Sequence, residues 1–458
     1  MSSTYYITGH RGAGKSTAGR LAGERLGWPV VDLDEVIEEG EGATCAEIIA
    51  EGEERFRGLE RDYRRRVVDE AGEGPRIVVL GGGYHPVPED GVVVWLDRDG
   101  WVEAAREGRQ RLKSEGDFED EVDWMVATRE PRWERRAHVK LEVPRGRGPE
   151  RVARDLATHL GWLEAMGESS LTRRSWVVAA EEGQVEPAAR QAQLLGLAGV
   201  EVRSDLMGAK AAAEVEAPIL ASLRTPDIEW LRAVGGRAEA LDIDLAYLER
   251  VLEAGLLAEM SPRGLLVSAH PDRVASAHVG RFTEALEAVA EAHPDWVDRL
   301  VVKYAPQIDD YDELHRAIDL RDGLRDRFER VTFLPQGDRY AWSRPPLAAD
   351  NATNYVPVGL APHRRDHTDN PVQTPLDLQA WLPHLAGPVP RQFEGLLGDP
   401  VRWSQGDVWH RRAAEGATSY LKIPAGRDLD DHEFARLFDA IERLPVRGLS
   451  VTSPHKKR

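Results

Sequence analysis

The sequence predicts an α/β protein with a parallel-sheet domain, a (β/α)8 barrel and a short, incomplete α/β segment. To about residue 161, strand-like apolar runs alternate with charged stretches of helical length, as in parallel α/β sheets. From Ser175 onward, eight short apolar runs recur, and a helical pattern follows most of them, which predicts the barrel. A proline-rich break at residues 387–391 then precedes the last segment.

Composition argues against a nucleic-acid-binding or membrane protein. The 458 residues correspond to about three domains of roughly 150 residues each. The net charge of −19 disfavours nucleic acid as a partner, because phosphate binding requires clustered Lys and Arg. We find no signal-peptide pattern and no apolar run of about 18 residues, so we expect no membrane span. The single cysteine, Cys45, excludes an intramolecular disulfide, and a cytoplasmic location fits.

Residues 1–163 form the first predicted domain. Its strand-like runs are, in order, TYYIT, WPVVDLD, RIVVLGGG and VVVWLDR. The second run predicts Asp32 and Asp34 at the end of one strand and on one face of it, because side chains alternate along a strand. Residues 164–174 are polar and lack a strong apolar period, so we interpret them as a linker.

The segment from Gly9 to Ser16 matches the phosphate-binding pattern G-x-x-x-x-G-K-[ST]. It follows a strand-like run and precedes a helical stretch at residues 17–26, a context that a chance glycine-rich turn would lack. In such a loop, backbone N–H groups surround the phosphates, the lysine reaches the outer phosphates and the hydroxyl binds Mg²⁺. The predicted ATP-binding residues here are Gly9, Gly12, Ala13, Gly14, Lys15, Ser16 and Thr17.

Four further motifs follow the phosphate loop. They are D-x-D at 32–34, G-E-x-x-F-R-x-x-E at 52–60, G-G-G at 81–83 and R-E-P-R-W at 129–133. In this order they resemble shikimate kinase, whose last motif is R-x-P-x-Y, so that Trp133 replaces a tyrosine. The resemblance covers about residues 4–142 and implies a P-loop kinase that phosphorylates shikimate with ATP and Mg²⁺.

The resemblance also implies individual roles. Asp34 would bind shikimate hydroxyls and help activate the attacking one, as a catalytic residue together with Lys15. Asp32 would join Ser16 in holding Mg²⁺, directly or through water. Both assignments fit phosphoryl transfer, which depends mainly on positioning and charge neutralisation.

For the acceptor, the resemblance implies that Arg57 and Arg129 clamp the shikimate carboxylate, a task that suits the guanidinium fork. The backbone would approach the substrate ring at Gly81, Gly82 and Gly83. The family's lid arginine would be Arg109, which also contacts ATP, with Arg111 as the alternative. We expect residues 113–122, which are acidic, to form a mobile lid.

The predicted barrel spans residues 175–386. Polar residues gather at the carboxyl ends of its apolar runs, which face the active site in such barrels. The eight runs cover residues 176–180, 200–204, 218–223, 240–245, 265–270, 300–305, 331–335 and 355–360.

Lys303 lies inside the apolar run LVVKYA. A buried lysine is costly unless it is paired or functional, and burial lowers its pKa and makes the amine nucleophilic, as a Schiff base requires. From this run alone, a lysine that points outward between helices is an equal alternative. His270, at the end of the preceding run, favours the catalytic interpretation because it could carry protons.

The polar residues of these runs occur in the order E-x-R-x-D, R-T, D-x-D-L, S-x-H and K. This order resembles type I 3-dehydroquinate dehydratase, which has D-x-E-L in place of D-x-D-L. The resemblance implies that Lys303 forms an imine with the C3 ketone of 3-dehydroquinate, without a cofactor, and that His270 moves the C2 proton. The implied substrate-binding residues are Glu201, Arg203, Arg224, Asp244, Arg344 (with Arg339 as the alternative) and Gln373.

Residues 393–458 contain the elements G-D-P-x-x-x-S and V-T-x-P-x-K. They resemble the opening of shikimate dehydrogenase, and Ser404, Thr452 and Lys456 would be vestigial site residues. The family's catalytic aspartate and its NADP-binding glycine-rich turn have no counterpart here. We therefore expect no dehydrogenase activity from this chain alone, and a truncated remnant, an incomplete reading frame and a split enzyme completed by a separate shikimate dehydrogenase chain are the alternatives.

The order of the three resemblances matches the C-terminal part of the fungal pentafunctional arom polypeptide. We expect a multifunctional shikimate-pathway enzyme whose partners are shikimate, ATP and 3-dehydroquinate, with a homodimer as one alternative assembly. A degenerate scaffold is a second hypothesis, but Lys15, Asp34, His270 and Lys303 are all present. A kinase of another metabolite fused to an aldolase-like barrel is a third.

Overall fold

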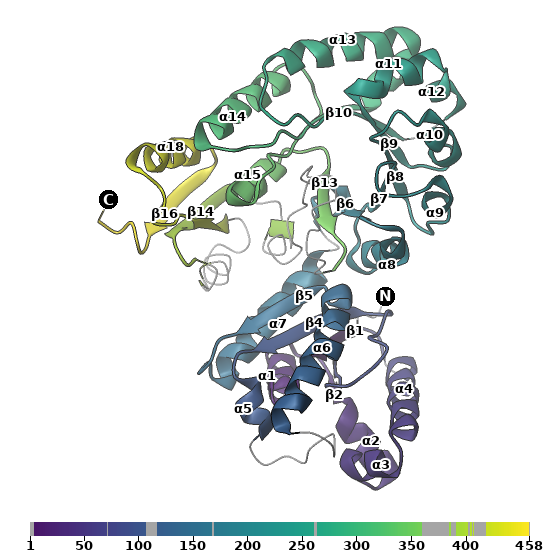
Figure 1. The fold of residues 1–458 in the computed structure, drawn as a ribbon, viewed down its shortest axis with the longest axis vertical. Helices are drawn as coiled ribbons and strands as arrows, with labels where there is room; N and C mark the ends of the chain where they lie inside the picture. The colour runs from purple at the N-terminus through teal and green to yellow at the C-terminus, as the bar shows by residue number, and fades with distance from the viewer. Residues whose placement is uncertain are drawn as a thin grey trace. The chain divides into compact units, whose positions relative to one another are not determined.

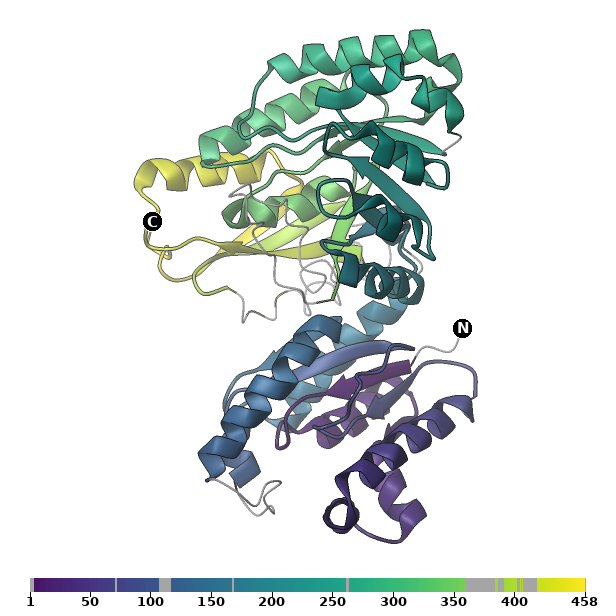
Figure 2. The ribbon, with the colours of Figure 1, turned by 45° about the vertical axis from the view of Figure 1, so that its right-hand side comes forward.

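The computed structural model describes residues 4–70, 72–106, 117–166, 169–260, 263–359, 384–385, 391–401, 404, 406 and 418–457. The chain divides between Glu164 and Ala165 into two compact units, although Val358 and Gly359 group with the first (Figures 1 and 2). Among the described residues, no helix combines the length and the apolar character that a membrane span requires.

The first unit contains a five-stranded parallel sheet in the order β2-β3-β1-β4-β5. The strands are β1 (Thr4–Thr8), β2 (Val30–Asp32), β3 (Arg76–Val79), β4 (Val92–Arg98) and β5 (Val139–Val143). The helices are α1 (Lys15–Leu26), α2 (Leu33–Glu41), α3 (Cys45–Glu51), α4 (Glu53–Asp69), α5 (Trp101–Arg106), α6 (Phe118–Arg136) and α7 (Pro149–Ala165). The predicted parallel-sheet class is confirmed. Strand β5 was not predicted; it is an edge strand in which charged residues alternate with apolar ones.

Helices pack on both faces of this sheet. On one face α1 approaches closely, since a Cβ at Gly19 would lie 2.8 Å from Val79 Cγ2. On the other face, Tyr6 and Val78 form a core with Trp133 of α6. The strands are thereby held between two helical layers, with the loops at their carboxyl ends left to form a site.

One prediction in this unit is wrong, and the mobile lid at 113–122 stays a prediction. Asp34 is not on a strand, because Asp32 ends β2 and caps α2 by accepting a hydrogen bond from Asp34 N at 3.2 Å. The predicted lid at 113–122 is in part helical, because Asp117 caps α6 and accepts a hydrogen bond from Asp120 N at 2.9 Å. Residues 107–116 lie outside the described residues.

The second unit contains eight parallel strands in the order β12-β11-β10-β9-β8-β7-β6-β13. They are β6 (Ser175–Val178), β7 (Gly199–Arg203), β8 (Ile219–Leu223), β9 (Ala240–Asp244), β10 (Gly264–Ala269), β11 (Leu300–Tyr304), β12 (Val331–Phe333) and β13 (Asn354–Pro357). The α-helices that follow them are α8 (Val185–Leu195), α9 (Ala209–Ala213), α10 (Ile228–Gly235), α11 (Leu245–Glu253), α12 (Leu256–Glu259), α13 (Ala277–Ala292), α14 (Tyr311–Arg325) and α15 (Arg344–Ala348). The predicted barrel is confirmed, since each apolar run overlaps one strand.

Side chains complete the barrel where β12 meets β13. The two strands share no regular ladder, but Ala352 N donates to the Val331 carbonyl oxygen at 3.0 Å. Thr353 N donates to Thr332 Oγ1 at 3.0 Å, and the two threonine hydroxyls lie 3.1 Å apart. The barrel is therefore nearly closed, and one backbone hydrogen bond and the threonine contacts join β12 and β13 where a regular ladder is missing.

The last segment forms a three-stranded parallel sheet in the order β15-β14-β16. Its elements are β14 (Gln392–Gly398), β15 (Thr418–Pro424), α18 (Asp431–Glu442) and β16 (Val446–Val451). Helix α18 lies beside α14 in both views (Figures 1 and 2), where Arg443 Nη2 and Asp319 Oδ1 form an ion pair at 2.6 Å.

Candidate active sites

Three glycines shape the loop between β1 and α1. Gly9, Gly12 and Gly14 have φ angles of 145°, 86° and 87°, which glycine adopts far more readily than other residues. A Cβ at Gly12 would also lie 2.9 Å from the Trp101 carbonyl oxygen. The loop leads directly into Lys15, the first residue of α1, where unpaired N–H groups of the first helical turn attract anions. The motif thus forms an anion-binding loop.

The other predicted nucleotide and metal ligands lie nearby along the chain. Lys15 Nζ donates to the His10 carbonyl oxygen at 3.2 Å, and Ser16 and Thr17 continue the first turn of α1. Asp32 uses one carboxylate oxygen to cap α2. In the described part of the chain no group of three or more His, Cys, Asp or Glu forms a metal cage. A hydroxyl and a carboxylate suit Mg²⁺, which takes its remaining ligands from phosphates and water.

The glycines after β3 bring the predicted acceptor residues together. A Cβ at Gly81 would lie 2.9 Å from Asp34 Oδ1, and one at Gly83 would lie 2.7 Å from Arg57 Nη2. Burial raises the pKa of Asp34, while the charge of Lys15 acts in the opposite direction. The bare backbone at these positions therefore leaves space between a carboxylate and a guanidinium group.

Gly82 connects this space to the phosphate loop. A Cβ there would lie 3.1 Å from the Gly9 carbonyl oxygen and 3.4 Å from Arg129 Nη1. Arg129 is 6% exposed, and its guanidinium lies 5.4 Å from the centre of the Trp124 ring. Burial and the charge of Arg57 lower the pKa of Arg129 to about 10, so it remains charged at neutral pH. One buried cation, Arg129, and one half-buried cation, Arg57, thus flank the pocket.

Glu60 is a member of this pocket to which the sequence analysis assigned no role. It is 1% exposed, and its Oε2 accepts a hydrogen bond from Arg57 Nη1 at 2.6 Å. A Cβ at Gly81 would lie 3.0 Å from the other oxygen, Oε1. Arg57 is held on its other side by Glu53 at 3.1 Å. Arg57 is therefore positioned by two carboxylates of its own helix.

His10, inside the phosphate loop, also had no predicted role. Its ring is 1% exposed and stacks on Trp101, with centroids 3.9 Å apart and an angle of 9°. Burial, together with the charges of Arg129 and Lys15, lowers the pKa of His10 to about 3. The 2.7 Å contact of Nε2 with Glu130 Oε1 is therefore a hydrogen bond from a neutral imidazole and not an ion pair.

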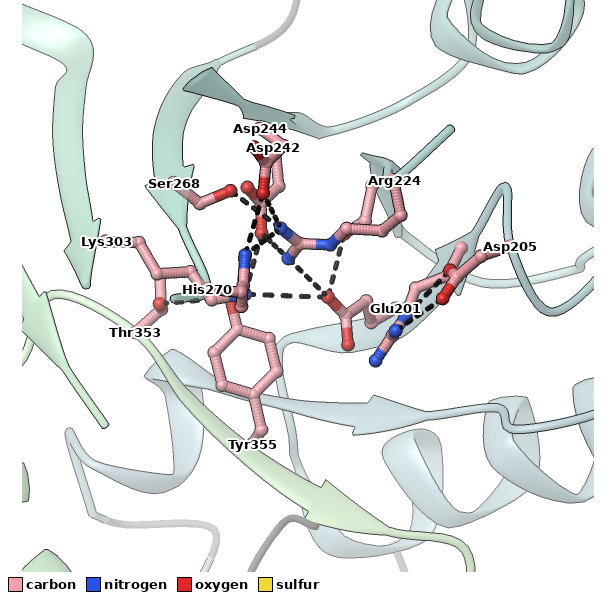
Figure 3. A network of polar contacts seen from close by, with 12 residues as sticks. Glu201, Asp205, Arg224, Asp242, Asp244, Ser268, His270, Lys303, Thr353 and Tyr355 are labelled. Atoms are coloured by element: carbon pink, nitrogen blue, oxygen red, sulfur yellow. Dashed lines mark hydrogen bonds and ion pairs between the residues drawn. The ribbon is translucent and has the colours of Figure 1, made fainter. Parts of the chain in front are cut away.

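In the barrel, Lys303 points into the interior (Figure 3). The side chain is buried, so the outward alternative is wrong. Nζ donates to Asp242 Oδ2 at 2.7 Å, lies 3.7 Å from Glu201 Oε1 and sits 4.1 Å from the centre of the Tyr355 ring. Burial lowers the pKa of Lys303, and the carboxylate of Asp242 acts against this shift. The amine is therefore easier to deprotonate than one in water.

Arg224 lies at the centre of the same network. Its Nη2 donates to Asp242 Oδ2 at 2.8 Å, and its Nη1 donates to Ser268 Oγ at 2.7 Å. Burial alone would raise the pKa of Asp242, but Arg224 and Lys303 together outweigh it and the net direction is downward. Asp242 is thus an ionised carboxylate shared by two buried cations.

His270 receives two competing contacts. Its Nδ1 lies 3.0 Å from Asp244 Oδ2 and 2.7 Å from Arg224 Nη1. A guanidinium can only donate, so the arginine contact requires Nδ1 without hydrogen, whereas donation to an ionised Asp244 requires Nδ1–H. Burial, with Arg224 and Lys303, lowers the pKa of His270 well below its usual range, and burial raises the pKa of Asp244. The position of Arg224 therefore decides which nitrogen of neutral His270 carries the proton.

Several predicted residues have no contact with this network or are not described. Arg203 forms a two-pronged pair with Asp205, at 3.0 Å and 2.6 Å, and Asp205 lies beyond the end of β7. Arg109 and its alternative Arg111 lie outside the described residues, as does Gln373.

Arg344, predicted to bind the substrate carboxylate, is buried at the start of α15. Its Nε donates to the Pro335 carbonyl oxygen at 2.7 Å, and its Nη2 donates to Gln336 Oε1, also at 2.7 Å. The alternative, Arg339, lies 3.6 Å from Asp428 in the last segment. Arg344 is thus held within the loop that follows β12.

The sequence analysis assigned no role to Asp242, Ser268 or Tyr355, which all contact the network. The position of Asp242 could have been predicted, since it lies two residues before Asp244 in an apolar run and so faces the same side of the strand as Asp244. The position of Tyr355 could not have been predicted, because only the pairing of β13 with β6 brings it to the barrel interior.

The two sequence motifs of the last segment, G-D-P-x-x-x-S and V-T-x-P-x-K, lie together at the carboxyl ends of β14 and β16. Thr452 N donates to the Leu397 carbonyl oxygen at 2.8 Å, and Asp399 N donates to the Ser453 carbonyl oxygen at 2.9 Å. Ser404 Oγ accepts a hydrogen bond from Gly406 N at 3.1 Å. Lys456 is exposed.

Comparison with known proteins identifies relatives for the first unit. A family model described as shikimate kinase matches residues 11–157. A shikimate kinase of Rhodopirellula baltica is 34% identical over 155 residues, which are 30% of this chain and 80% of that protein. One of Rhodococcus jostii is 32% identical over 164 residues, covering 34% of this chain and 95% of that protein.

Solved structures were also found. Shikimate kinase from Acinetobacter baumannii in complex with shikimate is 29% identical, with a TM-score of 0.30, over 35% of this chain and 91% of that chain. The dehydroquinate dehydratase and shikimate dehydrogenase from S. pombe AroM is 16% identical, with a TM-score of 0.35, over 62% of this chain and 57% of that chain.

Proposed function

Through its first unit the chain belongs to the shikimate kinase family, and from this premise we propose that it transfers the γ-phosphoryl group of ATP to the 3-hydroxyl of shikimate. One observation carries the proposal: Asp34, Arg57 and Arg129 converge on the glycines at 81–83 beside the phosphate loop. An acceptor with both a carboxylate and a hydroxyl would use the guanidinium groups for the first and the aspartate for the second.

In this mechanism the oxygen of the shikimate hydroxyl attacks the γ-phosphorus, the bond from that phosphorus to the bridging oxygen breaks, and ADP leaves. Asp34 orients the hydroxyl and accepts its proton, and its raised pKa makes it a better proton acceptor. Lys15 binds the outer phosphates. Ser16 and Asp32 would hold Mg²⁺, which neutralises phosphate charge when bound.

The kinase proposal is tested by supplying shikimate and saturating MgATP and measuring shikimate 3-phosphate. Arg129→Lys should raise the KM for shikimate about tenfold, because a lysine lacks the two-pronged fork, and Arg135→Lys on the exposed face of the same helix is the matched control. Phosphorylation of another small alcohol, with none of shikimate, would refute the acceptor assignment.

For the barrel we propose dehydration of 3-dehydroquinate to 3-dehydroshikimate. The proposal rests on a buried lysine amine beside polar atoms that lack partners. Within the described residues, Arg224 Nε, Asp242 Oδ1 and His270 Nε2 are buried without a hydrogen-bond partner. An unsatisfied buried polar atom costs free energy, so a polar ligand that reached all three would bind favourably.

The reaction would begin with attack of the neutral Lys303 amine on the C3 ketone, and loss of water from the adduct would give the imine. His270 Nε2 then takes the C2 proton and returns a proton to the departing C1 hydroxyl, so that water leaves. Hydrolysis of the imine releases the product and restores the amine. Asp242 and Glu201 stabilise the protonated imine.

For His270 to accept a proton at Nε2, its Nδ1 must carry hydrogen and donate to Asp244. This requires Arg224 to withdraw its 2.7 Å contact, and a substrate hydroxyl bound by Arg224 would draw it away. Dehydration is measured through the absorbance of the conjugated product, and loss of activity with a metal chelator would contradict the imine mechanism.

The two alternatives from the sequence make different predictions. A scaffold would catalyse neither reaction, and a kinase joined to an aldolase-like barrel would cleave a carbon–carbon bond and leave 3-dehydroquinate unchanged. For the last segment we propose a dehydrogenase-like fold without dehydrogenase activity, because residues 393–458 contain no G-x-G-x-x-G turn for NADP. NADPH-dependent reduction of 3-dehydroshikimate by this chain would refute that.

A further inference from the structure

We infer that His10 is a positioning residue of the kinase site, which ties the phosphate loop to the helix that carries Arg129. The inference deepens the proposed kinase function and rests on it. The motif G-x-x-x-x-G-K-[ST] does not specify a residue at this position, so the loop pattern alone assigns His10 no role.

The backbone of His10 organises the loop. Its carbonyl oxygen accepts hydrogen bonds from Lys15 Nζ at 3.2 Å and from Ala13 N at 3.1 Å. The phosphate-binding lysine is therefore directed by the carbonyl of residue 10. Any movement of this residue would move the acceptor that positions the ammonium group.

The ring of His10 is held on three sides. It stacks on Trp101 of α5, and Trp133 of α6 meets it edge-on with centroids 4.8 Å apart at 73°. Nε2 donates to Glu130 Oε1, also on α6, at 2.7 Å. The aromatic contacts could be made by a phenylalanine, but the hydrogen bond requires a ring N–H. A bond from a neutral N–H to a carboxylate is stronger than one between two neutral groups.

The hydrogen bond links the two halves of the site. Glu130 directly follows Arg129 on α6, and successive side chains on a helix point in different directions. One of this pair therefore reaches the acceptor pocket while its neighbour reaches the phosphate loop. If the loop and α6 move as one body, binding of one substrate favours the arrangement that binds the other, and the two affinities are coupled reciprocally.

The test is calorimetric titration of the full chain with shikimate, in the presence and absence of a non-hydrolysable ATP analogue and Mg²⁺. In the wild type we expect the analogue to tighten shikimate binding about fivefold or more. Glu130→Ala should reduce this ratio to about one and raise the KM for ATP. Glu130→Gln keeps an acceptor for Nε2–H and should restore the coupling. Glu134→Ala removes an exposed carboxylate one turn further along α6 and should leave it intact.

His10→Phe, which keeps the stacking, should behave as Glu130→Ala does. The inference is overturned if the wild type shows no coupling, if Glu130→Ala retains it, or if Gln fails to restore it. Absence of shikimate binding and turnover in the wild type would instead refute the kinase proposal itself.

Discussion

The kinase site and the barrel site place their functional groups in different ways. In the first unit the groups come from short motifs, each contained in one loop or one helix, and several are partly exposed. In the barrel, each of the adjacent strands from β7 to β11 supplies a group to one network, in the case of β8 from the residue directly after it. These are Glu201, Arg224, Asp242, Ser268 and Lys303.

The charges differ as well. The barrel network pairs two cations, Lys303 and Arg224, with the carboxylates of Asp242 and Glu201, as a buried network must if it is not to destabilise the fold. In the kinase pocket, no carboxylate among the described residues forms an ion pair with Arg129, and burial lowers the pKa of Arg129. One site is thus internally neutralised and suits imine chemistry, whereas the other suits anionic ligands.

The largest expected effect is the loss of dehydration activity when Lys303 is substituted. Lys303→Met removes the nucleophile but keeps the length of the side chain, and Asp242 retains Arg224 as its partner. Dehydration of 3-dehydroquinate should fall about 10⁴-fold or more, while shikimate phosphorylation stays within about twofold. Lys210→Met, an exposed lysine on α9, is the control for both assays. A variant that retained dehydration would show that Lys303 is not the nucleophile.

The reciprocal change is Lys15→Ala. Phosphoryl transfer should fall about 10²- to 10³-fold, because the cation that binds the outer phosphates is lost, while dehydration is unaffected. Steady-state rates for both reactions on the same preparation provide the measurement. Equal loss of both activities would mean that the two sites are not independent.

The contrast also explains what the sequence could predict. The phosphate loop, Asp34 and Arg57 lie in motifs whose spacing is local, so the sequence could show their resemblance to shikimate kinase, and that resemblance implied the pocket. The strand runs predicted the barrel, because alternation and length are also local properties. Tyr355 and the bond between His10 and Glu130 could not be predicted, since they join residues from separate elements and depend on packing.

Asp242→Asn tests the role of the barrel network through the pH dependence of dehydration. The carboxylate of Asp242 opposes the effect of burial, so its removal should lower the pKa of Lys303 further. More of the amine is then neutral at a given pH, and the acidic limb of kcat/KM for dehydration should move to lower pH. Loss of a partner for buried Arg224 should also cost about 3 kcal/mol of stability, measured by urea unfolding. A limb that moved to higher pH would contradict this assignment.

The smallest effect concerns the seam between β12 and β13. Thr353→Val removes the hydroxyl contact with Thr332 but keeps the shape of the side chain and the backbone bond. We expect a loss of about 1 kcal/mol in unfolding free energy and unchanged kinase activity. Thr158→Val, whose hydroxyl bonds only to a carbonyl of its own helix, should cost less. Equal costs would mean that the threonine seam contributes little to closure.

Reductive trapping of a substrate imine shows most directly whether the barrel contains a second active site. The full chain is mixed with 3-dehydroquinate, treated with borohydride and digested, and the modified peptide is identified by mass. We expect one stable adduct on Lys303, absent without substrate and retained in the Lys15→Ala variant. An adduct on any other lysine, or dehydration without a trappable adduct, would contradict it.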